Sequence, residues 1–286
     1  MRTTLNKSLL LLTVCALVAS CDQQSKNRQQ AADTVSAKAD TSMPAVLAGN
    51  DNLEYGYPGG KGIVLTKQFY VILFDTTTLV PELVTYHLTK ENLQGDAKRK
   101  DSFRPDSALP KGKRSELEDY KDSGYDRGHM APAADFKRSK EAMSETFLLS
   151  NMAPQRPKLN EITWSHLENE VRTLTKKHGS IWIFTGPLYL DSVNHKSEPK
   201  DYVGPHNVAV PTHFFKVILC EHSDGQREMF AFIMKNQLEK LPGASMDYAV
   251  TVRQVEELSG LNFFHRLPDD EETRLETAAA VTWPVQ

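Results

Sequence analysis

Cysteine is scarce in this sequence of 286 residues, and its three copies stand at positions 15, 21 and 220. Cys15 falls inside an N-terminal apolar run and Cys21 just after it, so the folded part is left with Cys220. One thiol excludes an intrachain disulfide framework and a cysteine-based zinc site. Cys220 ends the strand-like run FFKVILC at residues 214–220, which predicts a buried, inert thiol.

A strong charge imbalance, repeats and zinc-type histidine spacing are also missing. The formal net charge is −3, which argues against a surface that binds polyanions everywhere, so any nucleic-acid site has to be built locally. No repeat with a period of about 20 to 50 residues is present, which argues against a solenoid or a propeller. The nine histidines include no pair at the helical spacing of a zinc motif.

The first 20 residues have the features of a secretory signal. Arg2 and Lys7 precede an apolar run at residues 9–18 that is too short for a stable membrane span. Residues 18–21, with the sequence VASC, resemble the cleavage box of bacterial lipoproteins. We therefore expect residues 1–20 to be removed and Cys21 to be lipidated, which anchors the protein outside the cytoplasm, at the periplasmic face of a membrane. An ordinary signal peptide with a chance cysteine is the alternative.

Composition divides the rest of the chain into three parts. Residues 21–52 are rich in small and polar side chains and have few large apolar ones, which predicts a flexible linker. Residues 53–268 carry the patterned apolar segments and are the predicted folded domain. Residues 269–286 begin with the run DDEE, which predicts an acidic, solvated tail.

Short apolar runs predict a sheet. Residues 69–74 and 83–88 are β-branched and aromatic runs joined by an Asp-Thr-rich segment, as in a β-hairpin. Further strands are predicted at residues 147–150, 181–185, 208–219 and 229–234.

Two helices are predicted around these strands. Apolar residues in one stripe indicate a helix at about 161–177, which Gly179 stops, and a second helix at about 252–258 lies between Thr251 and Gly260. The order of elements indicates an α+β fold with a largely antiparallel central sheet and flanking helices.

The segment YDRGHMAP at residues 125–132 mixes the residue types of a site with those of a turn. His129 has an imidazole whose ordinary pKa, about 6.5, suits a general base near neutral pH. Arg127 offers a permanent positive charge to a phosphate oxygen, and Gly128 permits a close backbone approach. Taken alone, these residues fit a structured turn better than a site.

Downstream residues change that interpretation. Asn160, Glu168 and Arg172 supply an amide oxygen, a carboxylate and a guanidinium on or beside the first predicted helix. Magnesium prefers oxygen ligands and needs few protein groups, so Asn160 can hold it while Glu168 acts through water. Phosphodiester hydrolysis needs an activated water, a cation near the phosphate and positive charge for the transition state. Together with His129, these residue types point to that reaction.

The spacing along the helix sets a geometric condition. Asn160, Trp164, Glu168 and Arg172 recur at four-residue steps, which predicts one polar face directed away from most of the apolar stripe. At about 1.5 Å per residue, Glu168 lies about 12 Å and Arg172 about 18 Å along the axis from Asn160. Asn160 is therefore expected at or before the first turn. Arg172 either contacts phosphate or pairs with Glu168, four residues before it.

Several motifs in a fixed order resemble those of the DNA/RNA non-specific endonuclease family, which are ββα-metal or His-Me finger nucleases. The motifs are DRGH at 126–129, SNMAPQ at 150–155, LN at 159–160, Trp164 and LE at 167–168. TGPLY at 185–189 and VPTHFFKV at 210–217 are similar to the endonuclease G branch. The resemblance covers the chain from Glu54 to His265 and implies a ββα-metal nuclease fold for the domain at 53–268.

The resemblance also implies roles for the main site residues. His129 is the general base, and Asn160 is the direct ligand of magnesium, for which manganese can substitute. Glu168 acts on water in the shell of the metal. Arg127 and Arg172 contact the phosphate of the substrate.

Three further positions match the family less directly. Arg99 matches an upstream arginine that stabilises the transition state. Asn151 is expected among the substrate-binding residues, in a hydrogen-bonding, orienting role. Asp126 is assigned to the local fold and not to the metal.

The predicted function is a lipid-anchored, magnesium-dependent endonuclease that cuts DNA and RNA to 5′-phosphate ends. Contacts restricted to phosphate and sugar account for the absence of sequence preference. The alternative is a catalytically silent module that binds nucleic acid or a protein on the same fold, which the loss of His129 or Asn160 would mark; both are present. A zinc hydrolase is a third option, although His206 and His213 fit structural roles. The resemblance allows a homodimer, and the preference between DNA and RNA stays open.

Overall fold

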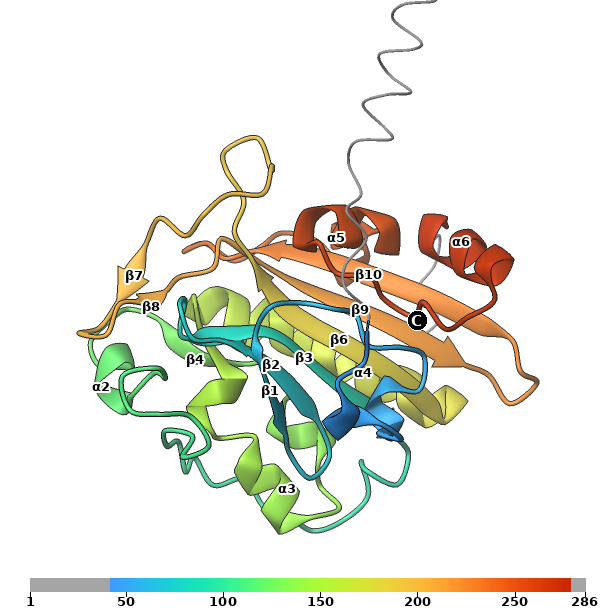
Figure 1. Cartoon of the computed structure of the whole chain (residues 1–286), viewed down its shortest axis with the longest axis horizontal. Coiled ribbons are helices and arrows are strands. Elements are labelled where there is room, and N and C mark those ends of the chain that lie inside the picture. Colours follow the sequence, from blue (N-terminus) through green and yellow to red (C-terminus); the bar gives the residue numbers. More distant parts are fainter. Residues whose placement is uncertain (1–41, 279–286) are drawn as a thin grey trace, which may run out of the picture. The chain divides into compact units, whose positions relative to one another are not determined.

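A seven-stranded sheet, in which every neighbouring pair of strands is antiparallel, forms the centre of the protein (Figure 1). The computed structural model describes residues 42–278, which fall in one compact unit. In spatial order the strands are β1 (Ile63–Thr66), β2 (Val71–Asp75), β3 (Val80–Thr89), β6 (Ser180–Leu188), β9 (His213–Glu221), β10 (Arg227–Lys235) and β11 (Ala249–Val250). The prediction of an α+β fold with a largely antiparallel sheet is confirmed.

The central strands read as continuous apolar runs because both faces of the sheet are covered. Successive side chains of a strand point to opposite faces. In β2, Ile72 and Phe74 therefore pack into one core, and Val71 and Leu73 pack into the other. The predicted hairpin at 69–74 and 83–88 is confirmed, since β2 pairs with β3.

Different helices cover the two faces of the sheet. Helix α4 (Ser165–His178) packs Leu167, Val171 and Leu174 into the same core as Ile72. Helices α5 (Val252–Ser259) and α6 (Asp269–Thr277) pack into the second core and lie together beside β9 and β10 in Figure 1. The sheet is thus the middle layer of three.

The ends of the two predicted helices follow local sequence signals. Thr251 caps α5 by accepting a hydrogen bond from the backbone N–H of Gln254, and Gly260 ends that helix in a left-handed conformation. Gly179 ends α4 with a φ of 107°. At its other end α4 continues a π-helix, η5 (Leu159–Trp164), and helical backbone begins at residue 157, four residues before the predicted start.

The remaining elements are short. Strand β4 (Asp126–His129) pairs with β5 (Met152–Gln155), and β7 (Tyr202–Val203) pairs with β8 (Val208–Ala209). The other helical turns are η1 (Ala45–Leu47), η2 (Asp51–Leu53), α2 (Leu117–Tyr120), η3 (Ala133–Asp135), α3 (Lys140–Glu145), η4 (Leu149–Asn151) and η6 (Ser245–Tyr248). Strands β4 and β5 with helix α4 form the ββα unit of the fold.

Two strand predictions are wrong. Residues 147–150 were expected to be extended, but Leu149–Asn151 is a 3₁₀ turn because its polar side chains bond to neighbouring loops, as Ser150 Oγ does to Asp106 Oδ2 at 2.6 Å. The segment 208–219 was expected to be one strand. It divides into β8 and β9 around Pro211, which has no backbone N–H for a ladder.

Two predicted boundaries also differ from the structure. Part of the expected linker is folded: η1 and η2 lie within residues 42–53, and Leu47 is fully buried. Part of the expected acidic tail is helix α6, whose Leu275 packs into the second core. Residues 1–41 and 279–286, including the predicted signal and Cys21, lie outside the described residues.

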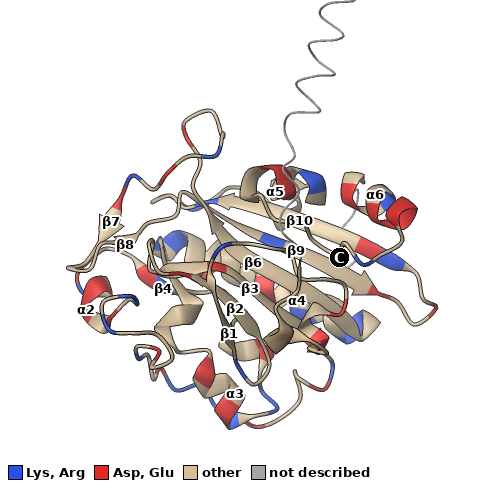
Figure 2. Ribbon diagram, in the orientation of Figure 1, with Lys and Arg blue, Asp and Glu red and all other residues tan. Residues whose placement is uncertain are grey.

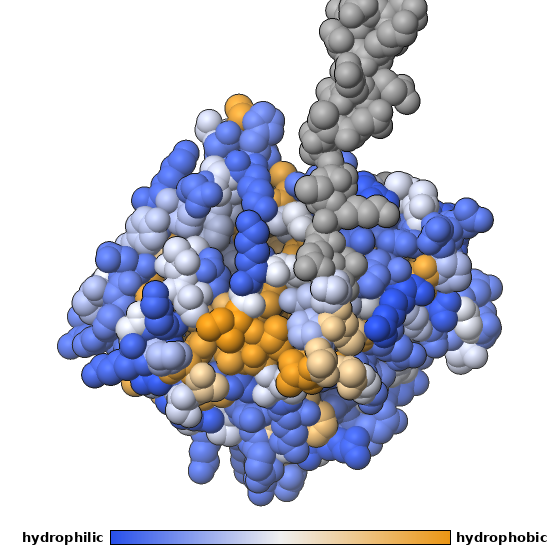
Figure 3. Space-filling model, in the orientation of Figure 1, coloured by the Kyte–Doolittle hydropathy of each residue, from blue (hydrophilic) through white to orange (hydrophobic). Residues whose placement is uncertain are grey.

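In the view of Figure 2, acidic and basic residues of 42–278 are interspersed along the ribbon, and no side of it carries charges of one sign only. Figure 3 shows an apolar area over β1 and β2, where Ile63 of the edge strand is 47% exposed. None of the helices in this part of the chain is long and apolar enough to cross a bilayer.

Candidate active site

A polar cavity of about 420 Å³ opens between β4 and the start of α4. Its lining combines the two halves of the site expected from the sequence. It is formed by Arg99, Phe103, Tyr120, Tyr125, Asp126, Arg127, His129, Pro132, Ala133, Ala134, Asn160, Glu161, Ser165, Glu168 and Arg172. Every predicted catalytic and metal-binding residue is in this set. A cavity of similar size, about 440 Å³, lies near residues 76–78 and has no histidine or arginine in its lining.

The DRGH segment is a strand and not a turn. In the β4–β5 ladder, Asp126 is opposite Gln155 and His129 is opposite Met152. Gly128 is required by this pairing, because a Cβ atom at that position would lie 2.4 Å from Oε1 of Gln155. The close approach predicted for Gly128 is therefore to the neighbouring strand.

Asn151 fixes the chain that follows His129. Its side chain is fully buried, accepts a hydrogen bond from the backbone N–H of Ala131, and donates to the carbonyl oxygens of Ala131 and Thr146, each at 2.9 Å. All three of these contacts are to backbone, and Asn151 does not line the cavity. These contacts fit the hydrogen-bonding, orienting role expected of Asn151, but they are made to the backbone around the loop after β4 and not to the cavity.

His129 is held as a neutral imidazole. It is 8% exposed and packs between Phe103 and Phe147, with ring centroids at 5.7 and 5.1 Å. Burial lowers its pKa to about 3, with help from the positive charges of Arg99 and Arg127 and against the opposing effect of Asp101. Its Nε2 atom is buried and has no hydrogen-bond partner within the described chain. A neutral ring with an unpaired nitrogen is the form that accepts a proton from water.

Asn160 approaches the same cavity from the helix side. It lies inside η5, a π-helical turn of the kind often found at functional sites. Its Nδ2 atom donates to Oδ2 of Asp126 at 2.8 Å, which leaves the Oδ1 atom as the acceptor available to the cavity. Asp126 therefore orients Asn160 in addition to its predicted role in the local fold.

Glu168 supplies a carboxylate one helical turn into α4. Burial raises its pKa, while the nearby charges of Lys216 and Arg172 act in the opposite direction. A hard cation in the cavity would favour the ionised form. An amide oxygen and a carboxylate are donors that suit a hard divalent cation, so the residues present fit a divalent metal ion of the kind that a ββα-metal fold implies.

The three predicted arginines reach the cavity in different ways. The guanidinium of Arg127 stacks on Phe103 at 4.2 Å from the ring centroid, and that of Arg99 lies 5.3 Å from the Phe147 centroid. Arg172 donates to Oδ1 of Asp135 at 2.8 Å. Of the alternatives expected for Arg172, the pairing with Glu168 is wrong, because Asp135 holds the guanidinium instead.

The predicted polar face of the helix is only partly polar. Trp164 stands between Asn160 and Glu168 in the four-residue series, but its side chain is only 1% exposed. Its ring packs against that of Phe214, with the two ring centroids 5.9 Å apart. The π-helical turn changes the rotation per residue before α4 begins, so the four-residue steps do not keep one face.

Two buried charged residues behind the cavity had not been predicted. Asp135 accepts hydrogen bonds from Tyr86 and Arg172, both at 2.8 Å. Lys216 is 1% exposed, donates to Thr185 Oγ1 at 2.7 Å and lies 5.0 Å from the Trp164 ring centroid. A lysine inside the apolar strand FFKVILC is a signal that could have been used, whereas Asp135 carries no such signal in the sequence.

Comparison with known proteins gives a consistent assignment. The family model for DNA/RNA non-specific endonucleases matches residues 48–270. Nuclease C1 of Cunninghamella echinulata var. echinulata is 39% identical over 242 residues, which cover 82% of this chain and 94% of the fungal protein. Human mitochondrial endonuclease G is 38% identical over 216 residues, with 73% of this chain and 72% of the human protein covered.

A solved structure agrees with these sequence relatives. The crystal structure of an EndoG/EndoGI complex contains a chain that superposes with a TM-score of 0.72 at 34% identity, covering 81% of this chain and 96% of that one. The ββα unit and its cavity are therefore found within a fold shared with a nuclease of known structure. The chain belongs to the DNA/RNA non-specific endonuclease family.

Proposed function

We propose that the protein is a magnesium-dependent endonuclease that hydrolyses phosphodiester bonds of DNA and RNA without sequence preference. The observation that carries the proposal is the meeting of His129 and Asn160 in one cavity, from β4 and from the start of α4. Arg99 and Arg127 line the same cavity and place positive charge where a phosphate would bind. A catalytically silent module has no need of a neutral, buried histidine beside such charges.

In the proposed reaction, the chain binds the scissile phosphate and removes one proton from water. Arg127, held against Phe103, and Arg99 contact the non-bridging oxygens. His129 accepts the proton while the water oxygen bonds to phosphorus and the bond from phosphorus to O3′ breaks. The departing O3′ takes up a proton from solvent, and His129 later returns its proton to solvent, so the products are a 5′-phosphate and a 3′-hydroxyl.

Asn160, through Oδ1, would hold the magnesium ion, and Glu168 would act through a water molecule. Magnesium, with manganese as a substitute, supplies positive charge beside the phosphate and the departing oxygen. The ion pair with Asp135 holds the Arg172 guanidinium at the edge of the cavity. Arg172 is proposed to add positive electrostatic potential there, at the substrate phosphate.

The test is cleavage of plasmid DNA and of RNA by the purified full-length protein. We expect cutting of both, loss with a chelator, and recovery with Mg²⁺ or Mn²⁺. His129→Ala should lower the rate by a factor of about 10² to 10⁴, the usual contribution of a general base. His195→Ala is the matched control, because that side chain is 78% exposed and outside the cavity. Cutting by His129→Ala at the wild-type rate would overturn the mechanism.

We also propose that the protein is a bacterial lipoprotein anchored through Cys21 at the periplasmic face of a membrane. The support is the sequence of residues 1–21 alone. Incorporation of labelled fatty acid into the wild-type protein, and its loss in Cys21→Ala, is the expected result. A soluble, unlabelled wild-type protein would contradict it. Light scattering on the same material would measure whether the chain forms the homodimer that the family resemblance allows.

A further inference from the structure

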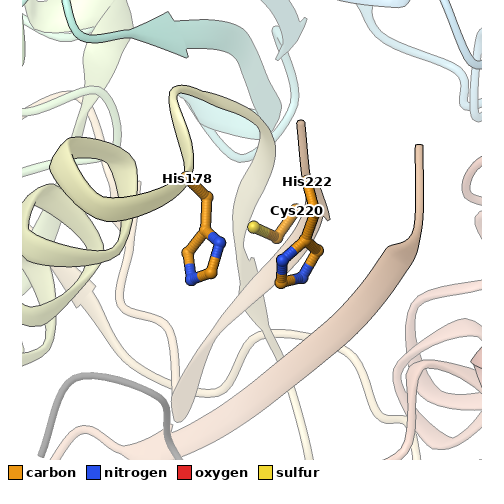
Figure 4. Close-up of side chains that lie close together, drawn as sticks. All are labelled: His178, Cys220 and His222. Carbon is orange, nitrogen blue, oxygen red and sulfur yellow. The ribbon is translucent and has the colours of Figure 1, made fainter. Parts of the chain in front are cut away.

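Three side chains with metal-binding atoms meet at the far end of α4 from the nuclease cavity (Figure 4). His178 is the last residue of α4, Cys220 lies in β9, and His222 follows β9. One ligand atom from each residue lies within 4.8 Å of the other two. His178 stands ten residues after Glu168, about 15 Å along the helix axis, so this cluster is separate from the proposed catalytic centre.

The three side chains lie close together and can be brought to one ion by small movements. Figure 4 shows the sulfur of Cys220 directed toward His178, with the ring of His222 on its other side. The two imidazole rings have centroids 4.1 Å apart and planes at 68°. A tetrahedral zinc ion places its nitrogen and sulfur ligands about 3.3 to 3.6 Å apart, so side-chain movements of roughly 1 Å complete that geometry.

His222 already has the support that a metal-bound histidine normally has. Its Nε2 atom is hydrogen-bonded to Oε2 of Glu228 at 2.9 Å, which leaves Nδ1 for an ion. Glu228 stands opposite Cys220 in the β9–β10 ladder, so the carboxylate and the thiol come from paired positions. A carboxylate behind a histidine fixes its tautomer and increases its basicity toward a metal.

We propose that His178, Cys220 and His222 form a site for a borderline-soft divalent metal ion, with Zn²⁺ as the ion that fits, and with water as the fourth ligand. Two imidazoles and a thiolate suit zinc, whereas magnesium prefers oxygen. One cysteine cannot build an all-cysteine site, but His222, two residues after Cys220, and His178, from the end of α4, complete this set. The sequence could not show it, because 42 residues separate His178 from Cys220.

Coordination changes the charge of the cluster. Without metal, Cys220 is a buried free cysteine. When the ion binds, the thiol releases one proton to solvent and the sulfur bonds as thiolate. The thiolate and the Glu228 carboxylate together offset the charge of the ion.

The site would join the C-terminal end of α4 to the β9–β10 pair. An ion that binds the folded chain and not the unfolded one stabilises the fold by mass action. The expected role is therefore structural: the ion fixes one end of the helix whose other end begins at the nuclease cavity.

The test is titration of the metal-free full-length protein with Co²⁺, with the thiol kept reduced. We expect a thiolate-to-cobalt absorption band that saturates at one equivalent and is removed by Zn²⁺ but not by excess Mg²⁺. His222→Gln and His178→Gln should lose the band, and His195→Gln, an exposed histidine elsewhere, should keep it. Zinc should raise the melting temperature of the wild type and leave that of His222→Gln unchanged.

The result is independent of nuclease activity, because no nucleic acid is present. Asn160→Ala should keep the cobalt band, which distinguishes this site from the catalytic one. Absence of a thiolate band in the wild type, or an unchanged band in His222→Gln, would overturn the proposal. If Cys220→Ala does not fold because the residue is buried, the two histidine variants still decide the question.

Discussion

The side-chain nitrogen of Asn160 donates to Oδ2 of Asp126 across 2.8 Å and so joins the helix side of the cavity to its strand side. This one contact decides which end of the amide faces the cavity. Asp126 is the first residue of β4 and stands three positions before His129, so the strand that carries the proposed base also orients the proposed metal ligand. This hydrogen bond therefore couples the two halves of the ββα unit.

Asp126→Ala is predicted to weaken metal binding more than it weakens the fold. Without the carboxylate, the Asn160 amide is free to rotate, and loss of such a supporting contact typically costs about 10 to 100-fold in metal affinity. We expect the Mg²⁺ concentration for half-maximal cleavage to rise by about that factor, with the maximal rate largely recovered at saturation. Asp126→Asn is the matched control, because its Oδ1 still accepts from Asn160. An unchanged Mg²⁺ requirement in Asp126→Ala would show that the contact does not orient the ligand.

Much of the fold was predictable because local and periodic signals agree with the tertiary structure. Thr251 and Gly260 bracket α5 as expected, and the apolar stripe of α4 does face the core. His129 and Asn160 could be paired because residue chemistry and motif order pointed to one reaction. The segment around Ser150 was wrongly predicted as a strand, because the hydrogen bond of Ser150 goes to Asp106, in a loop 44 residues earlier in the chain.

The parts of the site that escaped prediction depend on contacts distant in sequence. Asn151 resembles a substrate-binding amide until its three backbone partners are seen. Arg172 was expected either to contact phosphate or to pair with Glu168. Its ion-pair partner is instead Asp135, which lies 37 residues away in the chain. The type of a side chain determines which hydrogen bonds and ion pairs it can form, but the fold determines which partners lie close enough to form them.

Asn151→Ala is predicted to lower stability and turnover together. The substitution leaves the backbone N–H and C=O of Ala131 and the C=O of Thr146 without partners. Unmade bonds of buried groups cost about 1 to 3 kcal/mol each, so we expect a fall in the free energy of unfolding of roughly 3 kcal/mol. Urea denaturation and the cleavage rate measure the two effects.

Gln94→Ala, which removes an exposed amide, serves as the control and should change stability by less than about 0.5 kcal/mol. A substrate-binding role would give a different pattern for Asn151→Ala. In that case KM would rise selectively while the unfolding free energy stayed at the wild-type value.

His129 is predicted to titrate well below its ordinary pKa of 6.5 in the protein free of metal and nucleic acid. Burial is the largest cause, and the charge of Arg99 is the next. Arg99→Gln removes one positive neighbour and should raise the His129 pKa, while burial still holds it below 6.5. Imidazole chemical shifts measured against pH give both values. Lys100→Gln, at the adjacent exposed position, controls for net charge, and a wild-type pKa of 6.5 or above would refute the prediction.

The same shift has a consequence for stability. Because the unfolded chain binds the proton at a higher pH than the folded one, protonation of His129 favours unfolding. The contribution of His129 to stability is therefore lost as the pH falls below 6.5 toward the folded value of about 3. His129→Asn should show a weaker loss of stability over that range than the wild type does.

Asp106→Asn is predicted to destabilise the protein at neutral pH but not in acid. Asp106 is 2% exposed and binds Lys67 Nζ and Ser150 Oγ, both at 2.6 Å. Burial alone would raise its pKa, but the bonds from Lys67, Ser150 and the backbone N–H of Ala108 outweigh burial and lower the pKa. Its contribution is thus present above the ordinary value of 3.8 and is lost as the pH falls through the lower folded value.

The neutral amide introduced by Asp106→Asn would leave the buried Lys67 ammonium without a counter-charge, so we expect a loss of about 3 kcal/mol at pH 7. Urea denaturation near pH 7 and again below the folded pKa measures the difference. In acid the wild-type carboxyl is protonated as well, so the gap between the two proteins should close. Asp101→Asn removes a carboxylate that is 64% exposed and should cost less than about 1 kcal/mol at either pH. An equal penalty for Asp106→Asn at both pH values would mean that its shape, and not its charge, stabilises the loop against η4.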